Sequence, residues 1–115
     1  MKTLVVIPTY NERESLPITI EAIRKYNTVD ILVVDDGSPD GTGEWVKQSP
    51  DYGSTLFLLQ RTEKNGLGPA YIAGFTWALE RDYDVICEMD ADGSHRGRDP
   101  VSYTHLRAHE TPEHL

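Results

Sequence analysis

The sequence predicts an α/β fold in which a mostly parallel sheet carries helices on both faces. Four short runs rich in β-branched residues read as strands, and their hydrophobicity is continuous rather than alternating. Such runs are typical of strands that are covered on both sides, as in a parallel sheet. Helix candidates separate the runs, so the order is βαβαβαβ, and this order predicts right-handed crossovers and a doubly wound sheet. With 115 residues, the chain has room for one modest domain.

Each predicted element follows from a local pattern. The strands are expected at residues 3–8, 30–36, 54–60 and 83–90. Ser15 can cap the first helix, whose apolar side chains recur at helical spacing. A shorter helix is expected at residues 44–48, after a Gly-rich turn. The third is expected at residues 69–80, with Pro69 near its first position.

Composition and charge exclude several classes of protein. The net charge is −8 and the 11 basic residues are scattered, which argues against a nucleic-acid binder. No apolar run approaches the ~18 to 20 residues of a membrane-spanning helix, and no signal peptide is evident. The single cysteine, Cys87, excludes an internal disulfide, fits a reducing compartment and is expected in a buried strand. We therefore expect a cytoplasmic protein without a transmembrane segment, peripheral to the cytoplasmic face of the membrane if its substrate is a lipid.

Ligands of doubly wound sheets collect at the carboxyl ends of the strands, and three of the four predicted strand ends are acidic. The first strand leads into "PTYNE". There Pro8 can fix a bend, Tyr10 can stack on a base, and Glu12 can accept hydrogen bonds from a base or ribose. A plain polar turn with Tyr10 half-buried explains the same residues equally well.

The second strand leads into "DDGSPDG". Asp40 and Gly41 fit an ordinary turn and are expected to be structural. Asp35 and Asp36 are adjacent like charges, which repel each other unless a cation or a hydrogen-bond donor lies nearby. We expect one of these two aspartates to bind a ligand.

The fourth strand leads into "DADGSH". In extended geometry, residues i and i+2 point the same way, so Asp90 and Asp92 could aim two carboxylates at one site. Carboxylate oxygens suit Mg²⁺ or Mn²⁺, and such a metal could screen a diphosphate from this acidic protein. An isolated pair of this kind also occurs often as an Asp-rich turn.

The segment "NGLGPAYIAG" does not fit the common nucleotide loops. Tyr71 stands where a dinucleotide-binding fingerprint has its third glycine, and no P-loop lysine follows. We interpret the segment as a flexible loop before a helix, and a role of residues 66–68 toward substrate stays open.

Taken together, four ordered motifs resemble those of family-two glycosyltransferases of the GT-A fold, which is Rossmann-like. They are "VVIPTYNERESLP", "VVDDGSPDGTG", "RTEKNGLGPAYIAGF" and "EMDADGSH". Within this family the chain is most similar to dolichol-phosphate (polyprenol-phosphate) mannosyltransferases, also called polyprenol monophosphomannose synthases. The resemblance implies an inverting transfer of mannose from GDP-mannose to a polyprenyl phosphate with Mg²⁺ or Mn²⁺.

The resemblance also implies roles for individual residues. The nucleotide would be bound by Pro8, Tyr10, Glu12, Val34 and Asp36. Ala91 and Asp92 would contact the sugar nucleotide, and Asp92 would be the catalytic residue. The metal would be held by Asp90, Asp92 and Ser94. Many relatives carry glutamine where Ser94 stands, and a serine hydroxyl is a poorer ligand.

The last part of the chain departs from the family pattern. Residues 97–115 lack an apolar helical stripe and a predicted strand. His105 and His109 have helix-face spacing, but no third zinc ligand is evident. Residues 100–111 resemble the translation of a transposase mosaic-end adapter used in sequencing libraries. We therefore expect residues 1–96 to be an incomplete nucleotide-sugar-binding domain, inactive on its own, and residues 97–115 to be a non-native tail.

Three other interpretations stay open at this point. "DILVVDDG" is similar to the acidic pair of receiver-type phosphorylation domains, although a complete strand and helix precede it here. A non-catalytic module that binds sugar nucleotides would share the same motifs. A related transferase that uses another donor, such as UDP-glucose, would do so too.

Overall fold

The structure is a computed structural model that describes residues 2–26, 28–62, 67–91 and 103–104. Its elements, in chain order, are β1 (Thr3–Thr9), α1 (Ser15–Tyr26), β2 (Asp30–Asp35), α2 (Thr42–Gln48), β3 (Leu56–Gln60), α3 (Leu67–Leu79), β4 (Val85–Glu88) and β5 (Tyr103–Thr104). The strands form one sheet in the order β3-β2-β1-β4-β5. The pairs among β1 to β4 are all parallel, so the predicted mostly parallel α/β sheet is confirmed.

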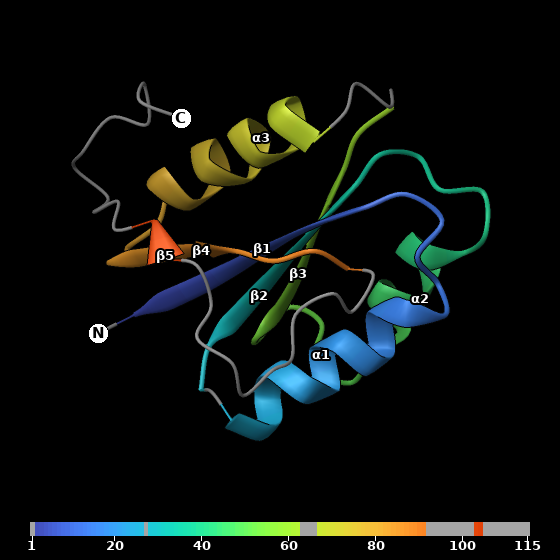
Figure 1. Ribbon diagram of the computed structural model, residues 1–115, viewed down its shortest axis with the longest axis horizontal. Helices are drawn as coiled ribbons and strands as arrows, with labels where there is room; N and C mark the ends of the chain where they lie inside the picture. The colour runs from blue at the N-terminus through green and yellow to red at the C-terminus, as the bar shows by residue number, and fades with distance from the viewer. Residues whose placement is uncertain (1, 27, 63–66, 92–102, 105–115) are drawn as a thin grey trace.

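The helices cover both faces of the sheet, with α1 and α2 on one side and α3 on the other (Figure 1). Strand alternation explains how each face acquires its core. In β1, Val5 and Ile7 belong to the cluster with α1, whereas Leu4 and Val6 belong to the cluster with α3. The strands are therefore apolar on both faces, which accounts for their unbroken hydrophobic runs.

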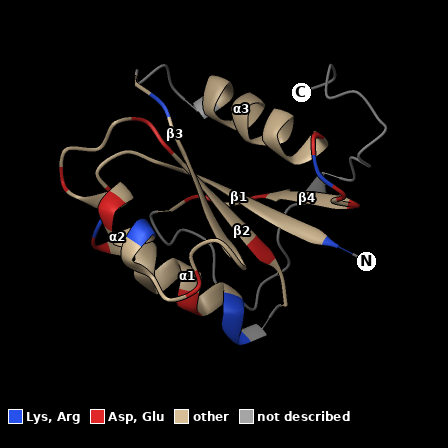
Figure 2. Ribbon diagram, turned by 180° about the vertical axis from the view of Figure 1, so that it is seen from behind, with Lys and Arg blue, Asp and Glu red and all other residues tan. Residues whose placement is uncertain are grey.

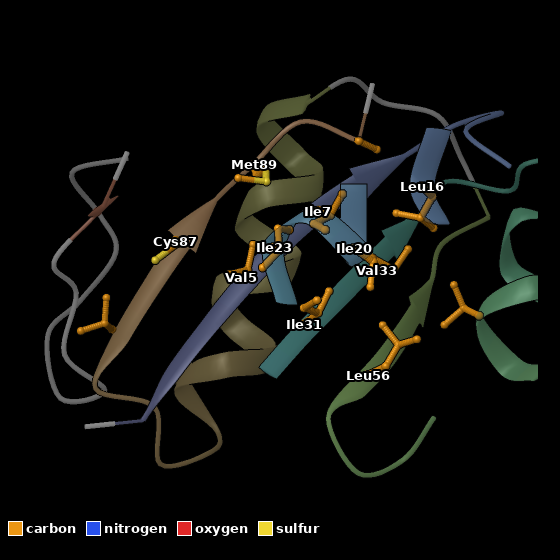
Figure 3. Packing of buried hydrophobic residues seen from close by; sticks show 13 residues of the cluster. Val5, Ile7, Leu16, Ile20, Ile23, Ile31, Val33, Leu56, Cys87 and Met89 are labelled. Carbon is orange, nitrogen blue, oxygen red and sulfur yellow. The ribbon is translucent and has the colours of Figure 1, made fainter. Parts of the chain in front are cut away.

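The larger cluster lies between the sheet and α1 (Figure 3). Leu16, Ile20 and Ile23 recur at helical spacing on α1, as the sequence predicts, and they pack on side chains of β1 and β2. Each is at most 4% exposed. Burial of a side chain of this size contributes about 1.5–3 kcal/mol, so this apolar stripe is what fixes α1 on the sheet.

On the other face, α3 lies very close to the sheet at Gly74. A Cβ atom at this position would lie 2.5 Å from Cγ1 of Val6 and 3.4 Å from Cγ2 of Val34. No side chain fits there without moving its neighbours, so Gly74 lets α3 approach β1 and β2.

Two predicted strands are shorter than expected. β4 covers Val85–Glu88 rather than residues 83–90, because it pairs with β1 only from Thr3 to Val6. β3 begins at Leu56 rather than at residue 54. There the carbonyl of Asp51 accepts the amides of Ser54, Thr55 and Leu56, which closes a turn.

The first two helices begin close to where they were expected. α1 begins at Ser15, whose hydroxyl donates to Oε2 of Glu12 at 3.0 Å. α2 begins at Thr42 rather than at residue 44. Gly41 precedes it with φ 88°, a left-handed conformation that glycine adopts without strain.

The third helix and the end of the chain differ more from the predictions. α3 begins at Leu67, and Pro69 lies in its first turn, where a missing N–H is tolerated. The expectation that the tail forms no strand is wrong for Tyr103–Thr104, which pair antiparallel with Cys87 and Ile86. None of the described helices is both long and apolar enough to cross a bilayer.

Candidate functional site

The carboxyl ends of β1, β2, β3 and β4 meet at one edge of the sheet, because these strands are parallel. Acidic segments follow β1 and β2 at this edge, and a basic segment follows β3 (Figure 2). The described acidic residues of the three predicted strand ends, Glu12, Asp36 and Asp90, are therefore brought to the same side of the molecule.

Asp35, at the end of β2, is a structural residue. It is 1% exposed. Its Oδ1 accepts from the hydroxyl of Thr9 at 2.7 Å and from that of Ser38 at 2.6 Å, and its Oδ2 accepts from the amide of Ser38 at 3.1 Å. These bonds use the carboxylate to join the ends of β1 and β2, so it is not the aspartate that is available to a ligand.

Asp36 differs from its neighbour. It is 7% exposed, and its Oδ1 lies 3.5 Å from Nη1 of Arg61, beyond the end of β3. Both atoms are buried and make no hydrogen bond within the part of the chain that the structure describes. Burial raises the pKa of Asp36, Arg61 acts to lower it, and Asp35 raises it further. A buried carboxylate with an unsatisfied oxygen is a candidate ligand-binding group.

The loops after β1 and β2 are joined to each other. The amide of Asn11 donates to Oγ of Ser38 at 2.8 Å, and the amide of Glu12 donates to Oγ1 of Thr42 at 3.2 Å. Oδ2 of Asp40 accepts the amide of Arg13 at 3.0 Å. The structural role predicted for Asp40 is therefore confirmed, and the loop that carries Tyr10 and Glu12 is held in place.

The predicted nucleotide residues of β1 and β2 lie at different depths. Pro8 and Val34 are buried and directly opposite each other in the ladder. Tyr10 and Glu12 are half-buried beyond the strand. The expected bend at Pro8 is wrong, because Pro8 continues β1. A missing N–H is tolerated there, since pairing with β4 has already ended at Val6.

Asp90 and Ala91 lie beyond the end of β4. The hydroxyl of Tyr71, on α3, lies 3.4 Å from Oδ1 of Asp90, and Oγ1 of Thr19, on α1, donates to the carbonyl of Ala91 at 3.1 Å. Ala91 is in a turn, so the strand alternation invoked for the two aspartates does not extend to it. Asp92 and Ser94 lie outside the described residues.

Negative charge accumulates where β4 meets α3. Burial and then Asp90 raise the pKa of Glu88. Burial and then the charges of Asp90 and Glu88 also raise the pKa of Tyr71, which keeps its hydroxyl protonated and able to donate. Two carboxylates that lie this close together form a favourable environment for a cation.

The part of the predicted metal site that the structure describes fits a hard divalent metal. Of the three predicted ligands, only Asp90 lies in a described segment, and its carboxylate is of the type that Mg²⁺ and Mn²⁺ prefer. Within the described segments, no three His, Cys, Asp or Glu side chains form a complete metal-binding group.

A separate groove of about 560 Å³ lies between α1 and α2 and contains none of the predicted site residues. Arg24 crosses it to Asp51, with Nη1 and Oδ2 2.6 Å apart. The groove is therefore separate from the candidate site.

Sequence reasoning missed Arg61, Tyr71 and Thr19. A signal existed for two of them, because Arg61 directly follows a strand and Tyr71 lies in a singled-out segment. For Thr19 there was none, since its partner is 72 residues away.

Comparisons with known proteins give a consistent result. The model of the family "Glycosyl transferase family 2" matches residues 4–100. An undecaprenyl-phosphate mannosyltransferase of Micrococcus luteus is 57% identical over 97 residues, which are 84% of this chain and 40% of that protein. A polyprenol monophosphomannose synthase of Mycolicibacterium smegmatis is 54% identical over 99 residues, covering 82% and 36% of the two chains.

Among solved structures, a mannosyltransferase of Pyrobaculum calidifontis in complex with GDP-Man and Mn²⁺ superimposes with a TM-score of 0.65. The two sequences are 26% identical, and the match covers 79% of this chain and 27% of that one. This chain thus spans less than half the length of each of these three proteins.

Proposed function

The chain belongs to glycosyl transferase family 2, and from this we propose that the protein transfers mannose from GDP-mannose to the phosphate of a polyprenyl (dolichyl) phosphate, with inversion at the sugar. The relatives from Micrococcus and Mycolicibacterium support the choice of sugar and of lipid acceptor. The Pyrobaculum structure supports the choice of GDP-mannose as donor. Membership of this family excludes a receiver-type phosphorylation domain.

The structural observation that supports this activity is that Glu12, Asp36 and Asp90 follow three parallel strands at one edge of the sheet. A nucleotide diphosphate-sugar needs acceptors for its base and ribose and a counter-charge for its diphosphate. An edge that offers separate carboxylates at neighbouring strand ends can meet both needs.

We assign the nucleotide to Pro8, Tyr10, Glu12, Val34 and Asp36. In this assignment, Tyr10 stacks on the base and Glu12 and Asp36 accept hydrogen bonds. Asp36 is the residue whose buried, unsatisfied oxygen favours a ligand most directly. The side chain of Val34 is fully buried in the core cluster next to α3, so we assign to this residue a main-chain contact.

We assign the metal to Asp90, Asp92 and Ser94, and the sugar nucleotide contact to Ala91 and Asp92. Bound Mg²⁺ or Mn²⁺ would neutralise the charge of the leaving diphosphate. The acceptor is already a phosphate anion, so the protein's main tasks are to orient the two substrates and to exclude water. A lipid acceptor would place the reaction at the cytoplasmic face of the membrane.

We further propose that residues 97–115 are a non-native tail and that the activity belongs to the complete natural protein. The family match ends at residue 100, so it includes residues 97–100 and leaves residues 101–115 outside. Sequencing the gene from genomic DNA tests it, because a natural reading frame that encodes "SYTHLRAHET" would disprove the tail assignment.

Transfer is tested with the protein encoded by the complete gene, radiolabelled GDP-mannose and a polyprenyl phosphate in detergent. We expect a labelled lipid whose formation requires Mg²⁺ or Mn²⁺. Asp92→Asn should abolish it, whereas Asp82→Asn, at an exposed turn after α3, should not. An intact, folded protein that transfers no mannose to several lipid acceptors would disprove the proposal.

Competition distinguishes mannose transfer from use of another donor. GDP should inhibit at concentrations at which UDP does not. If UDP inhibits better than GDP, the protein is a family member with a uridine-based donor.

A further inference from the structure

The segment Asp90–Ala91 is contacted from both helical layers. One contact comes from Thr19 on α1 and the other from Tyr71 on α3, which lie on opposite faces of the sheet (Figure 1). The amide of Met89 donates to the carbonyl of Val6 at 3.1 Å and joins the chain just before this segment to β1. Beyond Met89, these two side chains hold the main chain and the carboxylate.

Thr19 is a polar residue at an apolar position. It lies between Leu16 and Ile20 on the buried side of α1 and is only 3% exposed. Burial of a hydroxyl without a partner is destabilising, and the carbonyl of Ala91 supplies this partner at 3.1 Å. The hydroxyl therefore joins α1 to the peptide that precedes Asp92.

Tyr71 approaches the same segment from the other face. Its ring stacks on Phe75 with a centroid distance of 6.5 Å and an interplanar angle of 25°, and Phe75 is fully buried. This packing restricts the ring, so the hydroxyl stays 3.4 Å from Oδ1 of Asp90. The contact is longer than that of Thr19, and its contribution should be smaller.

We propose that Thr19 and Tyr71 are positioning residues that hold the Asp90–Ala91 segment in its binding conformation before donor and metal arrive. The inference rests on the proposed function, because it takes this segment to be part of the metal and sugar-nucleotide site. A preformed segment does not have to be ordered at the moment of binding, so affinity is gained without a new contact to the ligand.

The expected effects follow from what each substitution removes. Thr19→Val keeps the side-chain volume and removes the hydroxyl, and it should weaken Mn²⁺ binding in the presence of GDP by roughly 10-fold. Thr19→Ser keeps the hydroxyl and should restore most of this affinity. Tyr71→Phe should weaken binding by roughly threefold, because its hydrogen bond is longer.

The experiment uses the protein encoded by the complete gene, and it compares these three variants with the wild-type protein and with Tyr83→Phe. Tyr83 is a matched control, since its hydroxyl also bonds an aspartate, Oδ2 of Asp30 at 2.7 Å, away from the site. Hydrogen exchange of the peptide that contains residues 89–92 is measured without ligand. Mn²⁺ affinity in the presence of GDP is measured by titration, and thermal unfolding is followed for every variant.

Faster exchange of residues 89–92 and weaker Mn²⁺ binding in Thr19→Val, with recovery in Thr19→Ser, support the inference. Exchange and affinity in both Thr19→Val and Tyr71→Phe that equal those of Tyr83→Phe overturn it. If Thr19→Val does not fold, Tyr71→Phe is compared with Tyr83→Phe. Faster exchange and weaker Mn²⁺ binding in Tyr71→Phe then support the inference, and equal values overturn it.

The exchange measurement separates this inference from the proposed function. A complete wild-type protein that binds neither GDP nor Mn²⁺ would count against the function. Unchanged exchange in Thr19→Val and Tyr71→Phe would overturn the positioning role even where the complete wild-type protein binds both.

Discussion

Nη1 of Arg61 lies 3.5 Å from Oδ1 of Asp36, and neither of these buried atoms has a hydrogen bond within the described segments. The pair joins the end of β3 to the end of β2. Asp36 was singled out as a candidate from the sequence, whereas Arg61 was not. The structure places their opposite charges next to each other.

Arg61→Met should destabilise the chain by about 2–3 kcal/mol, because it leaves the carboxylate of Asp36 buried without its partner. This loss is smaller than the ~3–5 kcal/mol that removal of one partner costs in a fully buried ion pair, because the side chain of Arg61 is 19% exposed. Urea unfolding measures the loss. Arg61→Lys keeps the charge and should lose less, and the double variant with Asp36→Asn should lose less than the two single losses added together.

The loss in Arg61→Met should also depend on pH. Burial raises the pKa of Asp36 above its ordinary 3.8, and removal of Arg61, which lowers it, should raise it further. A raised carboxyl pKa gives stability that is present below pH 3.8 and lost as the pH rises through the folded-state value. The difference in free energy of unfolding between variant and wild type should therefore be larger at neutral than at mildly acidic pH. A difference that does not change with pH would contradict this account.

Gly74→Ala should destabilise the chain by about 1–3 kcal/mol, although alanine favours helices. The new Cβ would lie 2.5 Å from Cγ1 of Val6, so α3 or β1 must shift. Gly68→Ala is the matched control in the same helix, because no atom lies within 4 Å of its Cβ position. It should leave stability unchanged or raise it by up to about 1 kcal/mol. Equal effects at the two positions would show that helix propensity, not packing, determines how these substitutions change stability.

Cys87 should resist thiol reagents in the folded chain. It is 1% exposed, and burial raises the pKa of its thiol from 9.0 to about 12. At about pH 8 the reactive thiolate is therefore scarce as well as inaccessible. Reaction with Ellman's reagent should be slow in buffer and fast in concentrated guanidinium chloride, and fast labelling of the native chain would contradict the buried position.

The same thiol predicts a loss of stability in alkali. A raised thiol pKa stabilises the fold fully below pH 9.0, and this contribution is lost as the pH rises toward 12. The Cys87→Ala chain should lose less stability than the wild type between pH 9.0 and 12. Urea unfolding of the two chains across this pH range measures the difference.

Asp40→Ala should cost about 1 kcal/mol, because it removes acceptors for the amides of Arg13 and Thr42. Partial burial acts to raise the pKa of Asp40, but the hydrogen bonds from Thr42 and Arg13 lower it overall. Its contribution is therefore present above pH 3.8 and lost as the pH falls below it. Asp82→Ala, at an exposed turn, should change stability little, and urea unfolding at two pH values compares the variants.

The strands and their parallel arrangement could be predicted because each strand carries its own pattern. Val5 and Leu4 are both buried, on opposite faces, and this leaves an unbroken apolar run in the sequence. The ends of β4 could not be predicted in the same way. They depend on how far β1 runs alongside, which no local pattern in residues 83–90 records.

The candidate site was predicted at the level of strand ends but not of side-chain roles. Asp35 and Asp36 look alike in sequence, but their contacts differ. Asp35 accepts hydrogen bonds from the hydroxyls of Thr9 and Ser38, whereas Asp36 lies beside the guanidinium of Arg61. Thr19 looks like any polar residue on a helix, and only the fold brings it to Ala91. Contacts between distant parts of the chain decide these roles.

The alternation of β1 between two cores limits how this protein can change in length. Insertion of one residue inside β1 would turn every later side chain of the strand to the opposite face, exchange the contacts of Val5 and Val6, and shift Tyr10 and Glu12 relative to Asp36. Insertions after α2, where residues 49–55 form turns, would disturb neither core. Relatives that keep the same edge should therefore differ in loop length there, while the distance from β1 to its acidic loop stays constant.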